Sequence, residues 1–201
     1  SYPQLLASLL RLIPRHTDVI VSGAIQGLSF GIFLLIWMGL GLHLTSAQMG
    51  LGVDDVGYLG LFSALNVLTT PRLGKWADRT GPRRARVIVA FVQMLGVILL
   101  MFTGHSFWLL TIPVVIISVA GPMIDVTGRM TALGASPEIR TRLMSLYIIL
   151  MFAGGGLGSW VGTVAYDLGG WTLTSGLALI FSGMILGASV FTWRRGHAGS
   201  A

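Results

Sequence analysis

The chain has 201 residues, of which 54% are hydrophobic and only 10% are charged, and its formal net charge is +6. Soluble domains carry about 25% charged residues, so this composition, with a mean hydropathy of +0.82, excludes an ordinary soluble fold. The absence of cysteine excludes disulfides, thiolate metal sites and cysteine nucleophiles. The basic residues lie between apolar runs, so we expect membrane phosphates, and not nucleic acid, as their counterpart.

An amphipathic segment precedes the first apolar run, within residues 1–17. Its leucines and isoleucine recur at helical spacing, with Arg11 and Arg15 nearby. This pattern is typical of a helix on the cytoplasmic membrane surface, and the frayed end of a longer linker is the alternative. Because the chain begins with Ser-Tyr-Pro and no initiator methionine, we also expect a fragment or a processed product.

Six apolar segments follow, and each has the length that a helix needs to cross a hydrocarbon core about 30 Å thick. The runs are continuous and do not alternate, which favours helices over strands. We therefore predict an all-α membrane protein with a six-helix transmembrane domain over residues 18–194 and a cytoplasmic tail over 195–201. The segments cover residues 19–44, 56–73, 85–103, 107–128, 143–166 and 171–193.

The thirteen lysines and arginines are confined to alternate connections. Two precede the first segment, six lie between the second and third or at their facing ends, three between the fourth and fifth, and two follow the sixth. The other connections carry Asp54, Asp55 and Asp167. Six crossings put all the basic residues on one side, which the positive-inside rule makes cytoplasmic. We therefore predict a multi-pass protein of a bacterial inner membrane with both termini in the cytoplasm.

The most specific motif is GKWADRTGPRR, at residues 74–84. Its two glycines, Gly74 and Gly81, permit close approach and unusual backbone angles. Asp78 can accept hydrogen bonds from a helix N-terminus, and the arginines can pair with carboxylates or lipid phosphates. A basic anchoring loop with an incidental aspartate is the alternative.

This motif resembles the signature G-x-x-x-D-R-x-G-R-[KR]-[KR] of the major facilitator superfamily, which joins the second and third helices of a six-helix half. Pro82 departs from the pattern, where a basic residue is usual. The resemblance extends along the chain and implies one half of a two-half fold, built from two three-helix inverted repeats. In that family the loop belongs to a cytoplasmic charge cluster that holds one conformation and breaks during transport. The matching positions are Gly74, Asp78, Arg79, Gly81, Arg83 and Arg84.

The resemblance implies secondary active transport of a small organic solute by alternating access, as proton-coupled efflux by an antiporter. The expected partners are the lipid bilayer, the solute and a second six-helix half, in the same polypeptide or as a second copy. Residues 1–17 resemble the linker between halves, which favours the C-terminal half. We expect no cofactor and no metal. The alternatives are a non-transporting membrane scaffold or assembly protein and a homodimeric six-helix transporter.

An enzyme is not expected, because all four histidines lie at the ends of apolar segments or outside them and no G-x-S-x-G sequence is present. Asp125 lies inside the fourth predicted span and Arg129 lies at its end, and their spacing places them on one helical face. We expect this pair to act in the conformational gate or as a local structural pair, with proton carriage by Asp125 as the alternative.

Small and polar residues inside the spans supply the remaining candidates. Glycines at four-residue spacing permit close packing of membrane helices. The family resemblance implies that polar residues in the first, second and fifth spans are candidates for the solute path, with Trp37 as a stacking surface, and interhelical hydrogen bonding is the alternative for each. The glycines are Gly23, Gly27, Gly31, Gly154, Gly158 and Gly162, and the polar candidates are Gln26, Asn66 and Tyr147.

Overall fold

The computed structural model describes residue 14 and residues 16–198. The predicted surface helix and the last three residues of the tail lie outside the described residues. The described chain is helical and contains no strand. Its helices are α2 (Thr17–Leu44), α3 (Val53–Ser63), α4 (Leu65–Thr80), α5 (Pro82–Thr103), α6 (Phe107–Leu133) and α7 (Pro137–Ala198).

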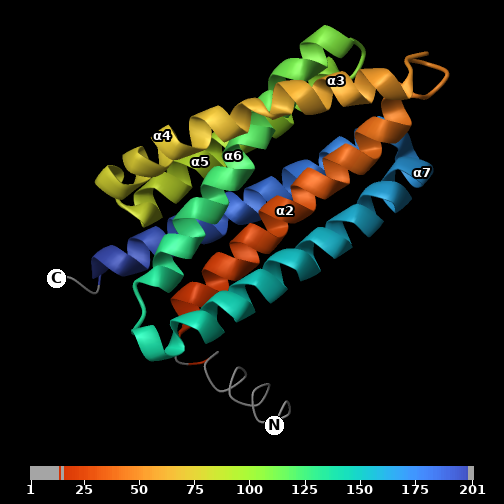
Figure 1. Ribbon diagram of the computed structural model, residues 1–201. Helices are drawn as coiled ribbons and strands as arrows, with labels where there is room; N and C mark the ends of the chain where they lie inside the picture. Colours follow the sequence, from red (N-terminus) through yellow and green to blue (C-terminus); the bar gives the residue numbers. More distant parts are fainter. Residues whose placement is uncertain (1–13, 15, 199–201) are drawn as a thin grey trace.

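The long helix α7 is two helical segments joined by a sharp reversal. Gly169 and Gly170 have non-helical backbone angles, and Gly170 has a φ of +58°, which glycine adopts without the strain that a Cβ introduces. Residues 137–168 and 171–198 therefore run in opposite directions, shown in cyan and blue in Figure 1. The second of these segments includes the predicted start of the tail, because the helix continues to Ala198.

The second predicted span is longer than expected and is divided. α3 ends at Ser63 and α4 begins at Leu65, so the pair covers residues 53–80 instead of 56–73. Ala64 between them has backbone angles of −63° and −12°, and its N–H donates to the carbonyl of Gly60 at 3.1 Å. The chain thus continues in the same direction through the break (Figure 1).

Four described helices are long and apolar enough to cross a membrane, judged by length and composition: α2, α5, α6 and α7. Because α7 holds two segments, the prediction of several membrane-crossing helices is confirmed for the described chain. α3 and α4 are each too short to qualify alone, so a crossing by that pair stays a prediction. The arrangement in inverted repeats also stays a prediction.

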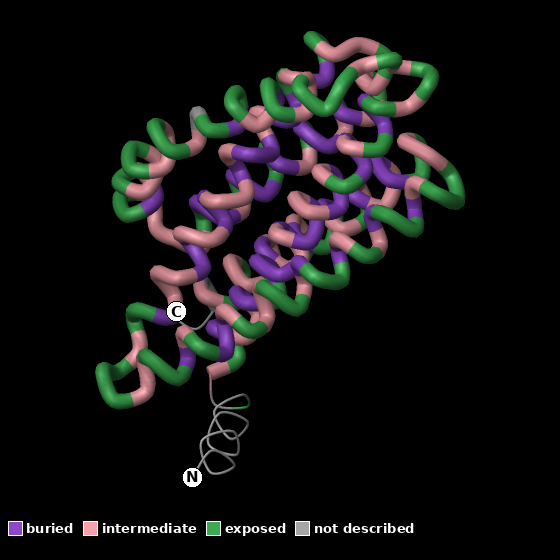
Figure 2. The backbone as a smooth tube through the Cα atoms, turned by 45° about the vertical axis from the view of Figure 1, so that its right-hand side comes forward, coloured by how far each residue is buried: buried purple, intermediate pink, exposed green. Residues whose placement is uncertain are grey.

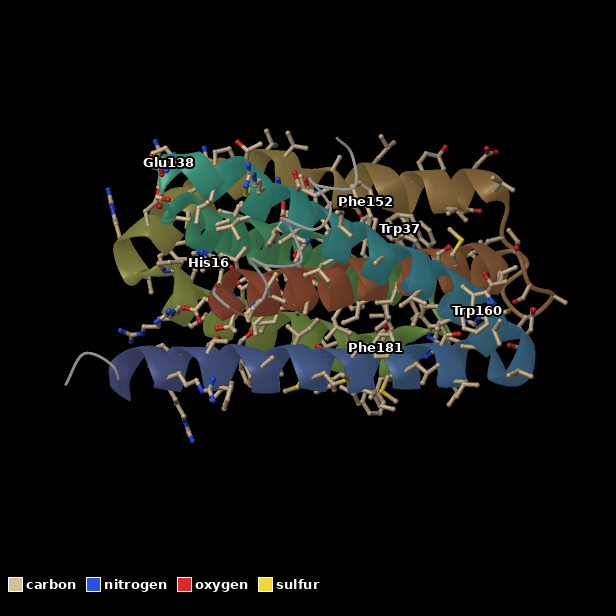
Figure 3. All side chains as sticks on the ribbon, turned by 90° about the horizontal axis from the view of Figure 1, so that it is seen from below. His16, Trp37, Glu138, Phe152, Trp160 and Phe181 are labelled. Atoms are coloured by element: carbon tan, nitrogen blue, oxygen red, sulfur yellow. The ribbon has the colours of Figure 1, made fainter. Side chains whose placement is uncertain are left out.

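The connections that carry the basic residues gather at one end of the bundle. The α4–α5 turn, the α6–α7 connection, the start of α2 and the end of α7 lie together there, and the α2–α3 and α5–α6 connections lie at the opposite end (Figure 1). Figure 3 shows His16 and Glu138 toward the basic end and Trp160 toward the other. The alternation of charge along the sequence therefore corresponds to two chemically distinct ends.

Helix α2 is the centre of the fold and packs most extensively on α7. Its buried side chains, among them Ile25, Ile32 and Leu35, belong to the main core cluster. Figure 2 shows that the buried residues gather where helices face one another, while exposed residues cover the outside. Many of these exposed residues are large and apolar, such as Phe102 and Trp108, as expected where lipid is the solvent.

The predicted glycines lie in the contact between α2 and the first segment of α7. A Cβ added to Gly27 would lie 2.6 Å from the carbonyl oxygen of Leu150, and one added to Gly31 would lie 2.8 Å from that of Gly154. From the other side, Cβ atoms on Gly154 and Gly158 would overlap the backbone of Gly27 and Gly31. The two backbones approach so closely that only glycine fits.

Candidate functional site

A cavity of about 290 Å³ lies between α2, α4, α6 and the first segment of α7. Three of the predicted path and gate residues from separate helices meet there: Gln26, Asn66 and Asp125. Most of the exposed lining surface is apolar, although six of the eleven lining residues are polar or charged and are of the kind that orient a bound solute. The lining residues are Gln26, Ser29, Phe30, Phe33, Asn66, Ser118, Gly121, Pro122, Asp125, Arg129 and Met151.

Asp125 and Arg129 form an ion pair one helical turn apart on α6. The Nε of Arg129 donates to Oδ2 of Asp125 at 2.8 Å, and both side chains are partly exposed. Tyr147 of α7 donates its hydroxyl to Oδ1 of the same carboxylate at 3.0 Å. Arg129 also lies over the Tyr147 ring, 5.6 Å from its centroid. The pair therefore ties α6 to α7 at the wall of the cavity.

A glycine makes the approach of Tyr147 possible. A Cβ added to Gly128 of α6 would overlap the hydroxyl of Tyr147 and lie 2.9 Å from one ring carbon. Tyr147 is itself fully buried, so it does not line the cavity and reaches it only through Asp125. The structure thus places Tyr147 as a partner of the charged pair.

Trp37 also lies outside the cavity lining. Its ring packs against Phe33, with centroids 5.9 Å apart, and it contacts the main core cluster. Phe33 in turn lines the cavity, so Trp37 lies one side chain removed from it.

Two buried glutamines make the interior behind the cavity polar. Gln93 of α5 is fully buried and donates its Nε2 to the hydroxyl of Ser29 at 3.1 Å. Gln26 is 5% exposed, and its Oε1 has no hydrogen-bond partner in the described chain. The hydroxyl of Ser118, which is 2% exposed, likewise lacks one. Such unpartnered groups are rare in protein interiors and mark positions where a ligand or water completes the hydrogen bonding.

The signature motif is helical along most of its length and is not a loop. α4 continues through Asp78 and Arg79, Gly81 alone departs from helical geometry, and α5 begins at Pro82. Proline is favoured at the first position of a helix, which accounts for its presence here. No described residue approaches either glycine closely, because a Cβ on Gly74 or Gly81 would meet nothing within 4 Å, so the close approach stays a prediction. The unusual backbone angle expected at the glycines is found at Gly81, which has a φ of +88°.

Of the charged residues in the motif, Arg83 makes an ion pair within the described chain. Its Nη2 lies 2.5 Å from Oδ2 of Asp18 at the start of α2. Asp78 is exposed, and its expected interaction with a helix N-terminus is not formed within the described chain, so that role stays a prediction. Arg79 and Arg84 are exposed at the same end. The motif thus connects the starts of α2 and α5 through Arg83.

Sequence analysis did not single out Arg86, although its guanidinium is the most deeply buried charged group in the described chain. Arg86 is 2% exposed and donates to the hydroxyl of Ser22 at 2.9 Å, the carbonyl of Thr127 at 3.1 Å and the hydroxyl of Thr131 at 3.0 Å. It joins α5 to α2 and α6 without a carboxylate partner. It is the fifth residue of its helix and follows Arg83 and Arg84, so its sequence position concealed it among membrane anchors.

Replacing Arg86 with methionine is expected to change the free energy of unfolding by less than about 1 kcal/mol, because it removes a buried charge that no acid compensates. Ser22 and Thr131 keep hydrogen bonds to backbone carbonyls of their own helices. Arg86→Lys keeps the charge but loses the fork that reaches three acceptors, and is expected to cost about 1–3 kcal/mol. Thermal unfolding in detergent measures both; a methionine variant less stable than the lysine variant would contradict this account.

A separate aromatic cluster lies at the end away from the basic residues. His43 is buried, its Nε2 lies 2.6 Å from the carbonyl oxygen of Gly104, and its ring stacks on Trp171 with centroids 4.7 Å apart. Tyr166 lies beside the same imidazole, with its hydroxyl 3.4 Å from Nδ1. These contacts hold α2, α5 and both segments of α7 together and give His43 a packing role.

The fold and the cavity define a multi-span membrane protein in which several polar side chains line a cavity between apolar helices. The Major Facilitator Superfamily matches residues 19–200, and the chain belongs to that family. It is therefore an integral membrane protein, and the predicted family resemblance is confirmed.

Particular relatives are known from Escherichia coli. The uncharacterized transporter YgaY of strain O157:H7 is 23% identical over 197 residues, which cover 98% of this chain and 49% of that protein. YgaY of strain K12 matches with the same identity and coverage. The chain thus spans about half the length of the curated relatives it matches.

Proposed function

We propose that this chain is one six-helix half of a secondary active transporter that moves a small organic solute by alternating access. Family membership and the names of both E. coli relatives support membrane transport as the general activity. The observation that carries the proposal is the cavity, where Gln26, Asn66 and the Asp125–Arg129 pair converge from three helices within an apolar bundle. Polar groups within membrane helices are costly and mark solute or ion pathways.

The second half that the proposal requires would face the cavity from outside this chain. The chain matches about half of relatives that are transporters by name, which supports a partner half in the same polypeptide, and a second copy of this chain is the other arrangement. We place this chain as the C-terminal half, in a bacterial inner membrane with the basic end and both termini in the cytoplasm. The distribution of lysine and arginine supports that orientation.

The gate of the proposed transporter is assigned to the basic end. The ion pair between Arg83 and Asp18 joins the starts of two helices there, and Gly81 sets the turn that leads into Arg83. In the proposal, contacts of this kind hold one conformation and break in the other. The remaining motif residues, Gly74, Asp78, Arg79 and Arg84, act with them in the gate.

Transport by the complete gene product in proteoliposomes tests the proposal. We expect uptake of one or more solutes from a panel of organic anions, cations and neutral compounds, with a rate that responds to an imposed pH gradient, as expected for proton-coupled efflux. The control is the same liposome without protein. A complete protein that is folded and moves none of the panel under any gradient would favour a scaffold or assembly role.

Asp125→Asn separates the two roles of the charged pair. We expect loss of the ion pair to lower stability by about 1 kcal/mol or less, given the partial exposure of both groups, while the amide oxygen of asparagine still accepts from Tyr147. Proton-driven transport is expected to persist, because both carboxylate oxygens already serve as acceptors for Arg129 and Tyr147. The measurement compares uptake driven by a pH gradient with solute exchange at equal pH. Loss of the first with retention of the second would make Asp125 the proton carrier.

A further inference from the structure

We infer that the cavity binds small amphipathic organic anions, with a carboxylate held by Arg129 and an apolar or aromatic body held by the cavity wall. The inference rests on the proposed function, which explains why a solute would enter the cavity. The binding itself is argued from the polar groups of the cavity that have no hydrogen-bond partner in the described chain.

The free charged group in the cavity is a donor. Both oxygens of Asp125 already accept hydrogen bonds, from Nε of Arg129 and from the hydroxyl of Tyr147. Arg129 uses only its Nε, and its two terminal nitrogens have no hydrogen-bond partner among the described residues. The guanidinium side chain is 35% exposed and lines the cavity. Its free edge offers two parallel N–H groups, the geometry that matches a carboxylate.

A second polar group of the solute is specified by Gln26. Gln26 lines the cavity, and its Oε1 is buried and has no partner in the described chain, so a small turn of the amide would let it accept a hydrogen bond from an occupant. Ser118 lines the cavity as well, and its buried hydroxyl also lacks a partner in the described chain. A solute with a hydroxyl or amide N–H on its body therefore binds more tightly than the same body without one.

The rest of the wall selects an apolar body of limited size. Phe30 and Phe33 are stacked, with ring centroids 6.2 Å apart and planes at 11°, and Met151 lines the cavity from α7. A volume of about 290 Å³ is just below the range of about 300–1,000 Å³ that is usual for ligand sites. One aromatic ring with a short acidic side chain fits this description.

An organic cation is the less suitable occupant. It requires a carboxylate that is free to accept, and Asp125 is the only acidic residue that lines this cavity in the described chain. Asp18, Asp54 and Asp167 lie at the ends of the bundle, away from the cavity lining. A cation would have to displace Arg129 from Asp125 and leave that guanidinium unpaired.

Equilibrium binding to the full chain in phosphatidylcholine nanodiscs tests the inference with probes of one shape and different charge. The probes are phenylacetate, phenylacetamide and phenethylamine, measured by calorimetry at physiological salt. We expect saturable binding of phenylacetate, about tenfold or more tighter than the amide, because a charge-assisted pair is replaced by a neutral one. The amine is expected to bind no better than the amide.

Variants assign the effect to residues. Arg129→Gln is expected to remove the preference for phenylacetate over the amide, and Arg129→Lys to keep part of it. Gln26→Leu is expected to remove any advantage of para-hydroxyphenylacetate over phenylacetate. Arg142→Gln, which changes an exposed arginine outside the cavity, is the matched control and is expected to bind as the unmodified chain does.

Several results would overturn the inference. They are amide or amine binding as tight as that of phenylacetate, absence of saturable binding by either carboxylate, or a preference that survives Arg129→Gln. If Arg129→Gln does not fold, the probe series on the unmodified chain still decides. Transport of only cations or neutral solutes by the complete protein would overturn this inference and leave the proposed function standing. Carboxylate binding without transport of any solute by the complete protein would overturn the proposed function and leave this inference standing.

Discussion

Gly158→Leu is expected to lower the free energy of unfolding by more than about 3 kcal/mol, or to prevent folding, because overpacking here cannot be relieved. A Cβ at Gly158 would overlap the backbone of Gly31, and backbone atoms cannot rotate away as a side chain can. The two helices would have to separate along their contact, which also holds Gly27 against Gly154. Thermal unfolding and monodispersity in detergent measure the effect.

Gly156→Leu, two residues away in the same helix, is the matched control. Gly156 is exposed, and an added Cβ would meet nothing within 4 Å. Leucine favours the helix over glycine by about 0.5–1 kcal/mol, so this variant is expected to be as stable as the unmodified chain or more so. Equal losses at both positions would show that the close α2–α7 contact does not determine stability.

Gly81→Ala is expected to cost about 1–3 kcal/mol, through backbone strain alone. Gly81 has φ +88° and ψ 132°, a conformation that side chains rarely adopt, and no other part of the described chain lies within 4 Å of an added Cβ. Gly81 forms hydrogen bonds to both α4 and α5. Its N–H donates to the carbonyl of Ala77 at 2.9 Å, and its carbonyl accepts from the N–H of Ala85 at 3.0 Å. A change in the turn would also move Arg83 relative to Asp18.

Gly74→Ala provides the comparison within the same motif. Gly74 is helical and has open space around it, so alanine is expected to stabilise α4 by about 0.5–1 kcal/mol. Thermal unfolding of the two variants side by side measures the difference. Equal effects of both substitutions would mean that the left-handed turn at Gly81 is not what requires glycine.

The sequence by itself determined the class of protein, because lipid as solvent requires long apolar helices and leaves a strong compositional mark. It also separated the two ends of the bundle, since lysine and arginine are confined to alternate connections. The family followed from the motif at residues 74–84. This motif can be recognised in the sequence because the turn that it forms involves only neighbouring residues. The division of the second span at Ala64 was not predicted, because it falls within a continuous apolar run.

What only the tertiary structure decided is which faces of the helices meet. A helix that is apolar all round shows no periodic contrast between lipid-facing and buried residues, so Tyr147 and Trp37 were assigned to the solute path without a signal for their direction. The same lack of contrast concealed Arg86, whose three partners come from two other helices. The cavity needs Gln26, Asn66 and Asp125 to converge from separate helices. That convergence depends on the close contact of α2 with α7, where glycine backbones touch, and no single stretch of sequence contains it.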